Sequence, residues 1–306
     1  MNQQPSGPAT PPRTRFAFAN HPWLSLVTFL FLSVLVLGVM GTVFSRGFGM
    51  PPGSRVTGFV NSLASHIILL FVITPFVLRL PKGRRSFREY LGDIGLTRVE
   101  PMGQLLVLAL SCYVILALSQ TAGSVVYRLT QGLPVTWGFL GSVFDLSHDL
   151  PPQSLSTVFS LPSAFEEVGS RGVILTLFLA RYSKRRSVLI AAGGFAVLHL
   201  LNLLGGREPV WVLGQLGWSF AMGIFYGYLF VKTRSLWPVM LIHYLANAFI
   251  GSLAGYMQSQ APVTTQVLYG LTFSLGVIPV TLMMLWVKFY TKRNDLSAPY
   301  NERGTE

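Results

Sequence analysis

The chain has 306 residues, of which 51% are hydrophobic and only 11% are charged, whereas charged residues make up about a quarter of an ordinary soluble domain. This composition argues against a soluble globular protein, and 22 Phe, 11 Tyr and 6 Trp argue against a disordered one. A net charge of +12 could suggest nucleic-acid binding. The basic residues lie between apolar segments instead of clustering, so we expect no nucleic-acid partner and an integral membrane protein.

Eight apolar segments of the sequence are candidate membrane spans, because about 20 residues at 1.5 Å each cross the hydrocarbon core. They cover approximately residues 23–44, 57–78, 102–127, 153–180, 187–205, 210–231, 236–257 and 266–288. We expect each of them to be a helix, since backbone exposed to lipid must satisfy its own hydrogen bonds. The sequence therefore predicts an all-α, polytopic membrane helix bundle of about eight transmembrane helices.

The distribution of Lys and Arg predicts the orientation, because these residues accumulate on the cytoplasmic side. With the N-terminus inside, eighteen of them fall in cytoplasmic segments, and four fall outside: Arg46, Arg55, Arg128 and Arg207. We therefore expect both termini in the cytoplasm and contacts between the basic loops and anionic lipids.

We expect five regions along the chain. They are a disordered Pro-rich cytoplasmic tail (1–22), N-terminal transmembrane helices (23–150), a catalytic core (151–260), the last transmembrane helix (261–290) and a cytoplasmic tail (291–306).

Charged residues inside a span are the strongest functional signal in this sequence. Of the eleven acidic residues, only Glu166 and Glu167 lie at membrane depth, with Arg171 close by. Such groups cost several kcal/mol unless they are paired or functional. Glu167 and Arg171 are four residues apart and can form an ion pair on one helical face. Glu166 points about 100° away, so it has no cation on its own helix and can act as a general base.

Two other spans supply polar partners. His199 lies in the fifth span, and His243 and Asn247 lie in the seventh. Their i, i+4 spacing places His243 and Asn247 on one face, where each can donate a hydrogen bond to an oxyanion. Helix rise places Glu166 about 22 Å deep, His199 about 18 Å and His243 about 10 Å, so His243 requires a tilted or re-entrant helix. His66, without a polar companion in its helix, is left out of the site.

These residues resemble three motifs of the CAAX prenyl protease 2-like family, also called the CPBP or Abi family of intramembrane proteases. The motifs are Glu166-Glu167-Val-Gly-Ser-Arg171, Phe195 four residues before His199, and His243 four residues before Asn247. The resemblance implies a helix bundle around an intramembrane catalytic cavity. It also implies that Glu166 and His199 activate a water, that His243 and Asn247 form the oxyanion site, and that Arg171 is structural.

The expected function is that of an intramembrane endopeptidase in a cell membrane, by family association a bacterial one. Its partner would be a membrane-embedded or lipid-anchored peptide, CAAX-like or otherwise. Family members are often labelled metalloproteases, and Glu166, His199 and His243 could form a His₂Glu zinc site. We favour no cofactor, since His243 with Asn247 is typical of oxyanion donors, but a zinc-dependent mechanism stays open.

Four rival functions explain less of the sequence. A serine protease with Ser219 as nucleophile and His243 as base leaves Glu166, Glu167 and Arg171 unexplained. An aspartyl protease has no Asp within a span to use. A proton-coupled transporter could relay protons through the same Glu and His residues, and a peptide or bacteriocin immunity factor would need no catalysis. These last two are the non-catalytic interpretations of the site.

Overall fold

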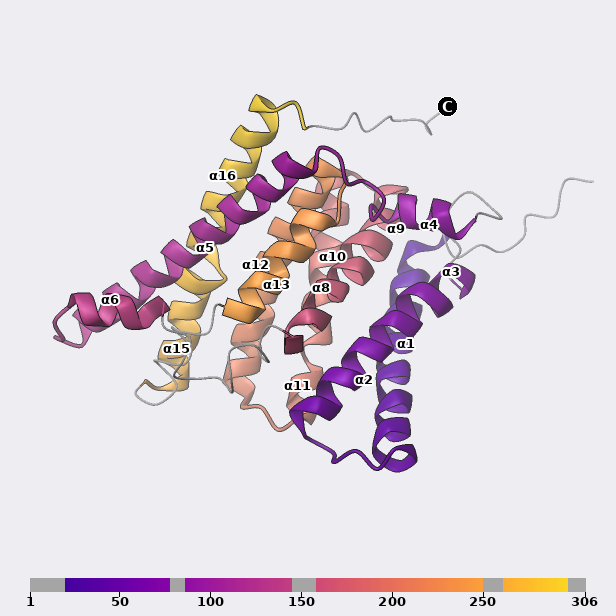
Figure 1. Ribbon diagram of the computed structural model, residues 1–306, viewed down its shortest axis with the longest axis horizontal. Helices are drawn as coiled ribbons and strands as arrows, with labels where there is room; N and C mark the ends of the chain where they lie inside the picture. The colour runs from indigo at the N-terminus through magenta and orange to yellow at the C-terminus, as the bar shows by residue number, and fades with distance from the viewer. Residues whose placement is uncertain (1–19, 78–85, 145–157, 250–260, 297–306) are drawn as a thin grey trace, which may run out of the picture.

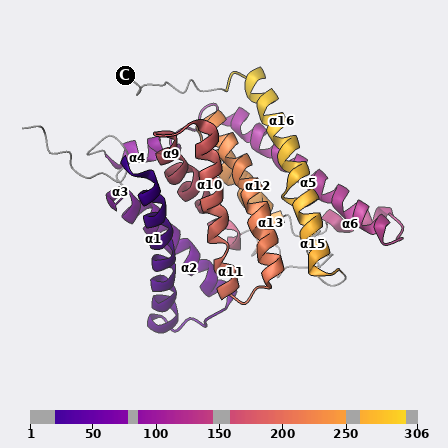
Figure 2. The ribbon, with the colours of Figure 1, turned by 180° about the vertical axis from the view of Figure 1, so that it is seen from behind.

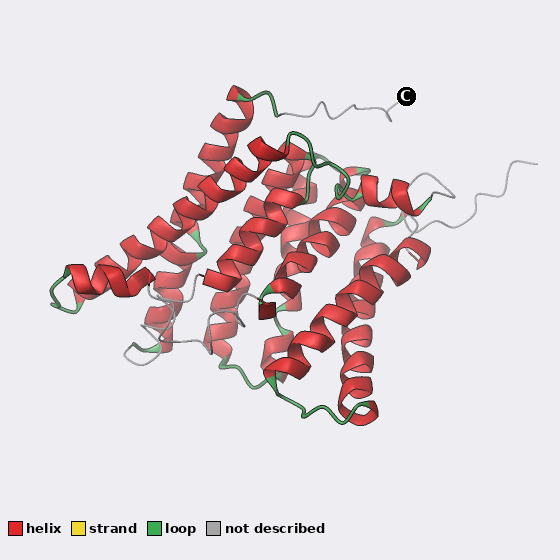
Figure 3. Cartoon of the chain, viewed as in Figure 1, coloured by secondary structure: helices red, strands yellow, loops and turns green. Residues whose placement is uncertain are grey.

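The computed structural model describes residues 20–77, 86–144, 158–249 and 261–296. Within these ranges every regular element is a helix and none is a strand (Figure 1, Figure 3), which confirms the all-α prediction. Most of both predicted tails, and the predicted boundaries near residues 150 and 260, lie outside the described residues. The five-region division of the chain stays a prediction.

The first half of the chain forms two long antiparallel helices, a short surface helix and one long oblique helix. The elements are α1 (Pro22–Thr42), η2 (Val43–Gly47), α2 (Arg55–Ile67), η3 (Ile68–Ile73), α3 (Thr74–Val77), α4 (Phe87–Asp93), α5 (Met102–Thr130) and α6 (Trp137–Phe144). The helices begin where the sequence supplies caps. Ser54 accepts a hydrogen bond from the backbone of Thr57, and Ser86 forms a capping box with Glu89.

The second half forms the centre of the bundle and its far edge. The elements are α8 (Leu161–Glu167), η4 (Val168–Leu175), α9 (Thr176–Leu179), α10 (Lys184–Leu198), α11 (Leu201–Leu204), α12 (Pro209–Thr233), α13 (Trp237–Phe249), α15 (Val263–Tyr269), η5 (Gly270–Ser274) and α16 (Val277–Arg293). Elements η2, η3, η4 and η5 are π-helical stretches that continue an α-helix, a variation often found at functional sites.

Within the described residues, five helical stretches are long and apolar enough to cross a membrane. They cover residues Pro22–Gly47, Arg55–Val77, Met102–Thr130, Lys184–Leu204 and Val263–Arg293. Large apolar side chains such as Phe31, Leu118 and Leu285 point outward from them and are 59–64% exposed, as expected for helices surrounded by lipid. The structure thus indicates an integral membrane protein. The count of eight spans and the orientation stay predictions.

The start of α1 and the end of α16 lie on the same side of the helix bundle (Figure 2). The start of α1 is tied to the α9–α10 connection, where Nε1 of Trp23 donates to the hydroxyl of Tyr182 at 3.0 Å and Nη2 of Arg181 donates to Asn20 at 2.7 Å. Figure 2 shows the start of α1 and the end of α16 at the upper edge of the molecule.

The segment that leads into α13 is buried beneath the α4–α5 connection. The Leu236 amide donates to the Gly95 carbonyl at 3.1 Å, and the Ser235 hydroxyl donates to the Arg98 carbonyl at 2.7 Å. Neither Ser235 nor Leu236 has exposed surface. Helix α13 is thus anchored at its start to the α4–α5 connection, and it packs mainly against α8 and α5. The depth of His243 in the membrane stays a prediction.

Candidate active site

The helix formed by α8 and η4 carries both intramembrane carboxylates and the cation. Glu167 and Arg171 have no exposed surface, whereas Glu166 is only partly buried and lines a cavity. Nη1 of Arg171 lies 3.0 Å from Oε1 of Glu167 and 2.9 Å from Oε2. The structure therefore contains the Glu167–Arg171 contact that their spacing predicts, and it separates the two adjacent glutamates into two environments.

Glu167 also binds His243, which the sequence did not indicate. Nδ1 of His243 lies 2.6 Å from Oε1 of Glu167. A carboxylate oxygen only accepts, so Nδ1 carries the proton and donates it in this hydrogen bond. The ring is thereby held with Nε2 turned away from Glu167. In the neutral ring Nε2 is an acceptor, and it becomes a donor when the ring is doubly protonated.

Aromatic rings enclose the Arg171 guanidinium. Its Cζ lies 4.5 Å from the centre of the Phe195 ring and 5.3 Å from that of Tyr226. Tyr226 also stacks on His243, with ring centres 5.3 Å apart and planes 25° apart. Nε and Nη2 of Arg171 have no hydrogen-bond partner within the described part of the chain. The ring faces therefore add cation–π stabilisation to that of the ion pair with Glu167.

Gly223 on α12 makes this close packing possible. A Cβ atom at this position would lie 2.9 Å from Cβ of Ala192 on α10 and 3.2 Å from Nη2 of Arg171. Helices α10 and α12 share the most extensive helix–helix contact in the described structure. The glycine thus lets α12 approach both α10 and the guanidinium, in agreement with the role in helix packing that glycines have in membranes.

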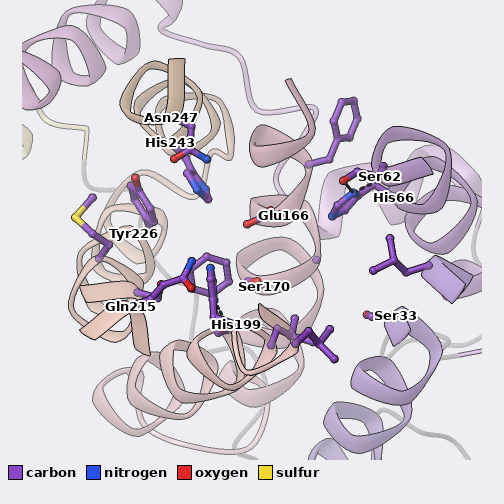
Figure 4. Close-up of a pocket in the computed structure, with 18 of the residues that line it drawn as sticks. Ser33, Ser62, His66, Glu166, Ser170, His199, Gln215, Tyr226, His243 and Asn247 are labelled. Carbon is purple, nitrogen blue, oxygen red and sulfur yellow. Dashed lines mark hydrogen bonds between the residues drawn. The ribbon is translucent and has the colours of Figure 1, made fainter. Parts of the chain in front are cut away.

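A cavity of about 470 Å³ opens beside α8. Four predicted site residues line it: Glu166, His199, His243 and Asn247. They come from three separate helical segments, since His199 follows the end of α10 and α13 carries both His243 and Asn247. Figure 4 shows the Glu166 carboxylate pointing to the side of α8 on which the other three lie.

His199 is oriented by the last turn of α10. Its Nδ1 lies 3.1 Å from the carbonyl oxygen of Phe195, and the edge of one ring faces the other with centres 5.0 Å apart. A carbonyl oxygen accepts hydrogen bonds, so Nδ1 is the donor. Nε2 of the neutral ring then keeps a lone pair that can accept a hydrogen bond from water.

His66 lines the same cavity, although it was not expected in the site. It has a polar companion one turn earlier in α2. Its Nδ1 lies 2.7 Å from the carbonyl oxygen and 3.5 Å from the hydroxyl of Ser62. In Figure 4 both residues lie across α8 from Glu166. The expectation that His66 has no polar companion in its helix is therefore wrong, because Ser62 lies four residues before it on the same helical face.

Other residues that line the cavity were not predicted from the sequence, among them Tyr226, Asn202 and Gln215. Tyr226 gives no sequence signal, since tyrosines are common in apolar helices near the membrane surface. Gln215 does give one, because it is a lone side-chain amide in an apolar span. Polar residues within spans mark internal surfaces, and this rule, applied beyond charged residues, would have identified it.

The residues proposed as zinc ligands do not form a metal site in this arrangement. Within the described residues, no three His, Cys, Asp or Glu side chains lie close enough together to hold a metal ion. A His₂Glu zinc site needs three such ligands at about 2 Å from one ion. Nδ1 of His243 is occupied by Glu167, which leaves only Nε2 of this ring.

Comparison with known proteins gives one match. Residues 150–249 match the family model described as Type II CAAX prenyl endopeptidase Rce1-like. No curated protein and no solved structure matches the chain. The matched segment covers about a third of the chain and includes α8 to α13, hence Glu166, Glu167, Arg171, His199, His243 and Asn247. This match of residues 150–249 to the Rce1-like type II CAAX prenyl endopeptidase family confirms the resemblance drawn from the sequence motifs.

Proposed function

We propose that this protein is an intramembrane endopeptidase in which Glu166 and His199 activate a water molecule, and His243 and Asn247 stabilise the oxyanion. One observation carries the proposal: these four side chains, from three separate segments of the matched domain, line one cavity. The match of residues 150–249 to the family model supports endopeptidase activity in general. The roles of the individual residues are inferred from their chemistry.

Glu166 has the environment that a general base needs. It is the charged side chain that lines the cavity, and Arg171, the nearest cation on its helix, is bound to Glu167. In the proposed reaction Glu166 takes one proton from water while Nε2 of His199 accepts a hydrogen bond from the other. The water oxygen then attacks the carbonyl carbon of the scissile peptide bond.

Attack converts the carbonyl oxygen into an oxyanion. Asn247 can donate to it from its side-chain amide, and His243 can donate from Nε2 when both ring nitrogens carry protons. Glu167 then acts as a positioning residue, since it holds Nδ1 of His243 and thereby directs Nε2. Glu166 finally passes its proton to the leaving nitrogen as the C–N bond breaks, which yields one carboxyl and one amino product.

The substrate class follows from the site's surroundings and the family. The cavity lies among apolar helices, so we propose a membrane-embedded or lipid-anchored peptide, including C-terminal CAAX-like sequences. Basic connections such as Arg181 to Arg186 would contact anionic lipids. We place the protein in a cell membrane as a multi-pass protein, with the bacterial origin resting on family association alone.

The function is tested by purifying the wild type and the Glu166→Gln variant, reconstituting both in liposomes and measuring cleavage of a library of membrane-anchored peptides. Glu100→Gln, at an exposed acid outside the cavity lining, serves as matched control. We expect wild type and control to cleave, with and without a strong chelator, and the Glu166→Gln variant to fold without cleaving.

Different outcomes would favour a different mechanism or function. Cleavage abolished by chelator and restored by zinc would favour the zinc-dependent mechanism. Folded wild-type protein that cleaves no peptide would favour a proton-coupled transporter or an immunity factor, and proton flux across the same liposomes would separate these two.

A further inference from the structure

Two side-chain amides form a pair at the wall of the cavity. Nδ2 of Asn202 donates to Oε1 of Gln215 at 2.7 Å, and both residues line the cavity. Asn202 belongs to the short helix α11, and Gln215 belongs to α12. Neither residue has a role in the proposed water activation or oxyanion stabilisation.

The pair lies next to His199. The backbone amide of Asn202 donates to the carbonyl of His199 at 3.0 Å, and the carbonyl of Asn202 accepts from the amide of Arg207 at 3.1 Å. The backbone of Asn202 is therefore fixed on both sides. Figure 4 shows the Gln215 side chain reaching the space beside the His199 ring.

The hydrogen bond between the amides leaves part of their capacity unused. A side-chain amide has two N–H donors and one carbonyl acceptor. The contact takes one donor of Asn202 and one lone pair of Gln215, so the NH₂ group of Gln215 and the carbonyl of Asn202 are left to bind other groups. One donor and one acceptor side by side complement the carbonyl and the N–H of a peptide group.

An amide in an apolar helix also needs a compensating interaction. Gln215 is the single side-chain amide between Pro209 and Thr233, in a stretch otherwise rich in Leu, Val, Phe and Trp. Placing a polar group in such surroundings is unfavourable unless it is hydrogen-bonded. A bond to Asn202 satisfies one atom, whereas a peptide substrate in the cavity would satisfy the remainder.

We propose that the Asn202–Gln215 pair is a subsite that binds the peptide backbone of the substrate beside the scissile bond. This inference rests on the proposed peptidase function and adds a specificity element to it. The subsite recognises an extended peptide by its backbone, so it tolerates different side chains while it aligns the scissile carbonyl with Glu166 and His199.

A purely structural pair, which would only tie α11 to α12, makes a different prediction. Gln215→Glu keeps an oxygen acceptor for Asn202 and removes the NH₂ donor. Gln215→Met removes both at similar size. A structural pair would tolerate Gln215→Glu and suffer from Gln215→Met, whereas a backbone subsite would lose substrate affinity in both variants.

Binding is measured apart from cleavage, in the Glu166→Gln background, by fluorescence anisotropy of a labelled CAAX peptide in detergent, in prenylated and unprenylated forms. We expect Gln215→Glu and Gln215→Met each to weaken binding about three- to tenfold, the loss of one hydrogen bond. Their unfolding temperatures should match that of Glu166→Gln alone. In the active background the same changes should raise KM more than they lower kcat. Gln131→Glu, at an exposed amide after α5, controls for added charge.

The outcomes are distinct from those that test the peptidase function. Weaker binding by both Gln215 variants supports the subsite even if the wild type cleaves nothing. Three results would overturn it: wild-type affinity in both variants; weaker binding only for Gln215→Glu, which indicates charge repulsion; or weaker binding and lower stability only for Gln215→Met, which indicates a structural pair.

Discussion

Two neighbouring carboxylates on one helix face two different environments. Glu167 is fully buried and contacts Arg171 and His243, and the His243 ring stacks on Tyr226. Glu166 is partly buried and lines a cavity together with His199 and Asn247. A single helical step of about 100° produces the separation. The comparison shows how adjacent, identical side chains can serve structure on one side of a helix and chemistry on the other.

The largest expected effect is the loss of kcat when Glu166, the carboxylate that lines the cavity, is changed. Glu166→Gln keeps the size of the side chain and removes the base, so we expect kcat to fall by about 10²- to 10⁴-fold. The unfolding temperature in detergent should stay within about 2 °C of the wild type, because no buried partner is lost. Cleavage at more than a tenth of the wild-type rate would show that another group accepts the proton.

The next largest effect is the loss of stability when Glu167, the buried carboxylate, is changed. Glu167→Gln leaves Arg171 buried without an anion, and we expect a loss of about 3–5 kcal/mol of stability. Thermal unfolding followed by tryptophan fluorescence measures it. The double variant Glu167→Gln with Arg171→Met should recover much of this stability, since no unpaired charge is left. It should not recover cleavage, because His243 still lacks its carboxylate. A single variant as stable as the wild type would contradict the ion-pair role.

A variant of Asn247 tests whether α13 contributes an oxyanion donor to the cavity. Asn247→Ala removes one oxyanion donor, and we expect kcat to fall by about 10²- to 10³-fold with little change in KM. Asn294→Ala, at the end of α16 and outside the cavity, is the matched control. A rise in KM with unchanged kcat would instead assign Asn247 to substrate binding.

A variant of Gly223 tests the close packing of α10 and α12 around Arg171. Gly223→Ala places a methyl group against Ala192 and Arg171, and we expect a loss of about 1–3 kcal/mol through overpacking. Gly38→Ala on α1, where a Cβ would meet no atom within 4 Å, should leave stability unchanged or slightly raised. Equal stability of the two variants would show that α10 and α12 can move apart without penalty.

The smallest effect concerns Tyr90 of α4, whose hydroxyl donates to the Leu70 carbonyl at 2.7 Å. Burial raises the pKa of the Tyr90 phenol above its usual value of about 10. The stability this group contributes is therefore complete below about pH 10 and is lost as the pH rises towards the folded-state pKa. Tyr90→Phe should cost about 1 kcal/mol at neutral pH. Its unfolding temperature should fall less steeply above pH 10 than that of the wild type, and equal slopes would contradict this account.

Much of the helical content could be predicted from the sequence, because apolar segments bounded by charges have few other ways to fold in a membrane. Each of the eight expected segments contains a helix in the described structure, although only five continuous helices meet the length and hydropathy of a span. The π-helical stretches, such as Val168–Leu175, were not predicted, since they depend on packing between helices and not on local preference.

Contacts in the candidate site could be predicted where both residues lie on one helix and their spacing brings them together. The Glu167–Arg171 pair follows from i, i+4 geometry. The contact between Glu167 and His243 does not, because it depends on how α13 packs against α8. The start of α13 is set in turn by hydrogen bonds from Ser235 and Leu236 to the carbonyls of Arg98 and Gly95. Contacts between elements of this kind cannot be derived from one helix at a time.

The most direct test compares Glu166→Gln and Glu167→Gln in one experiment, with kcat for a cleaved peptide and the unfolding temperature measured on the same preparations. The account predicts that Glu166→Gln loses cleavage at an unchanged unfolding temperature, and that Glu167→Gln lowers the unfolding temperature by several degrees. The reverse pattern, or wild-type cleavage by Glu166→Gln, would contradict the division of roles between the two glutamates.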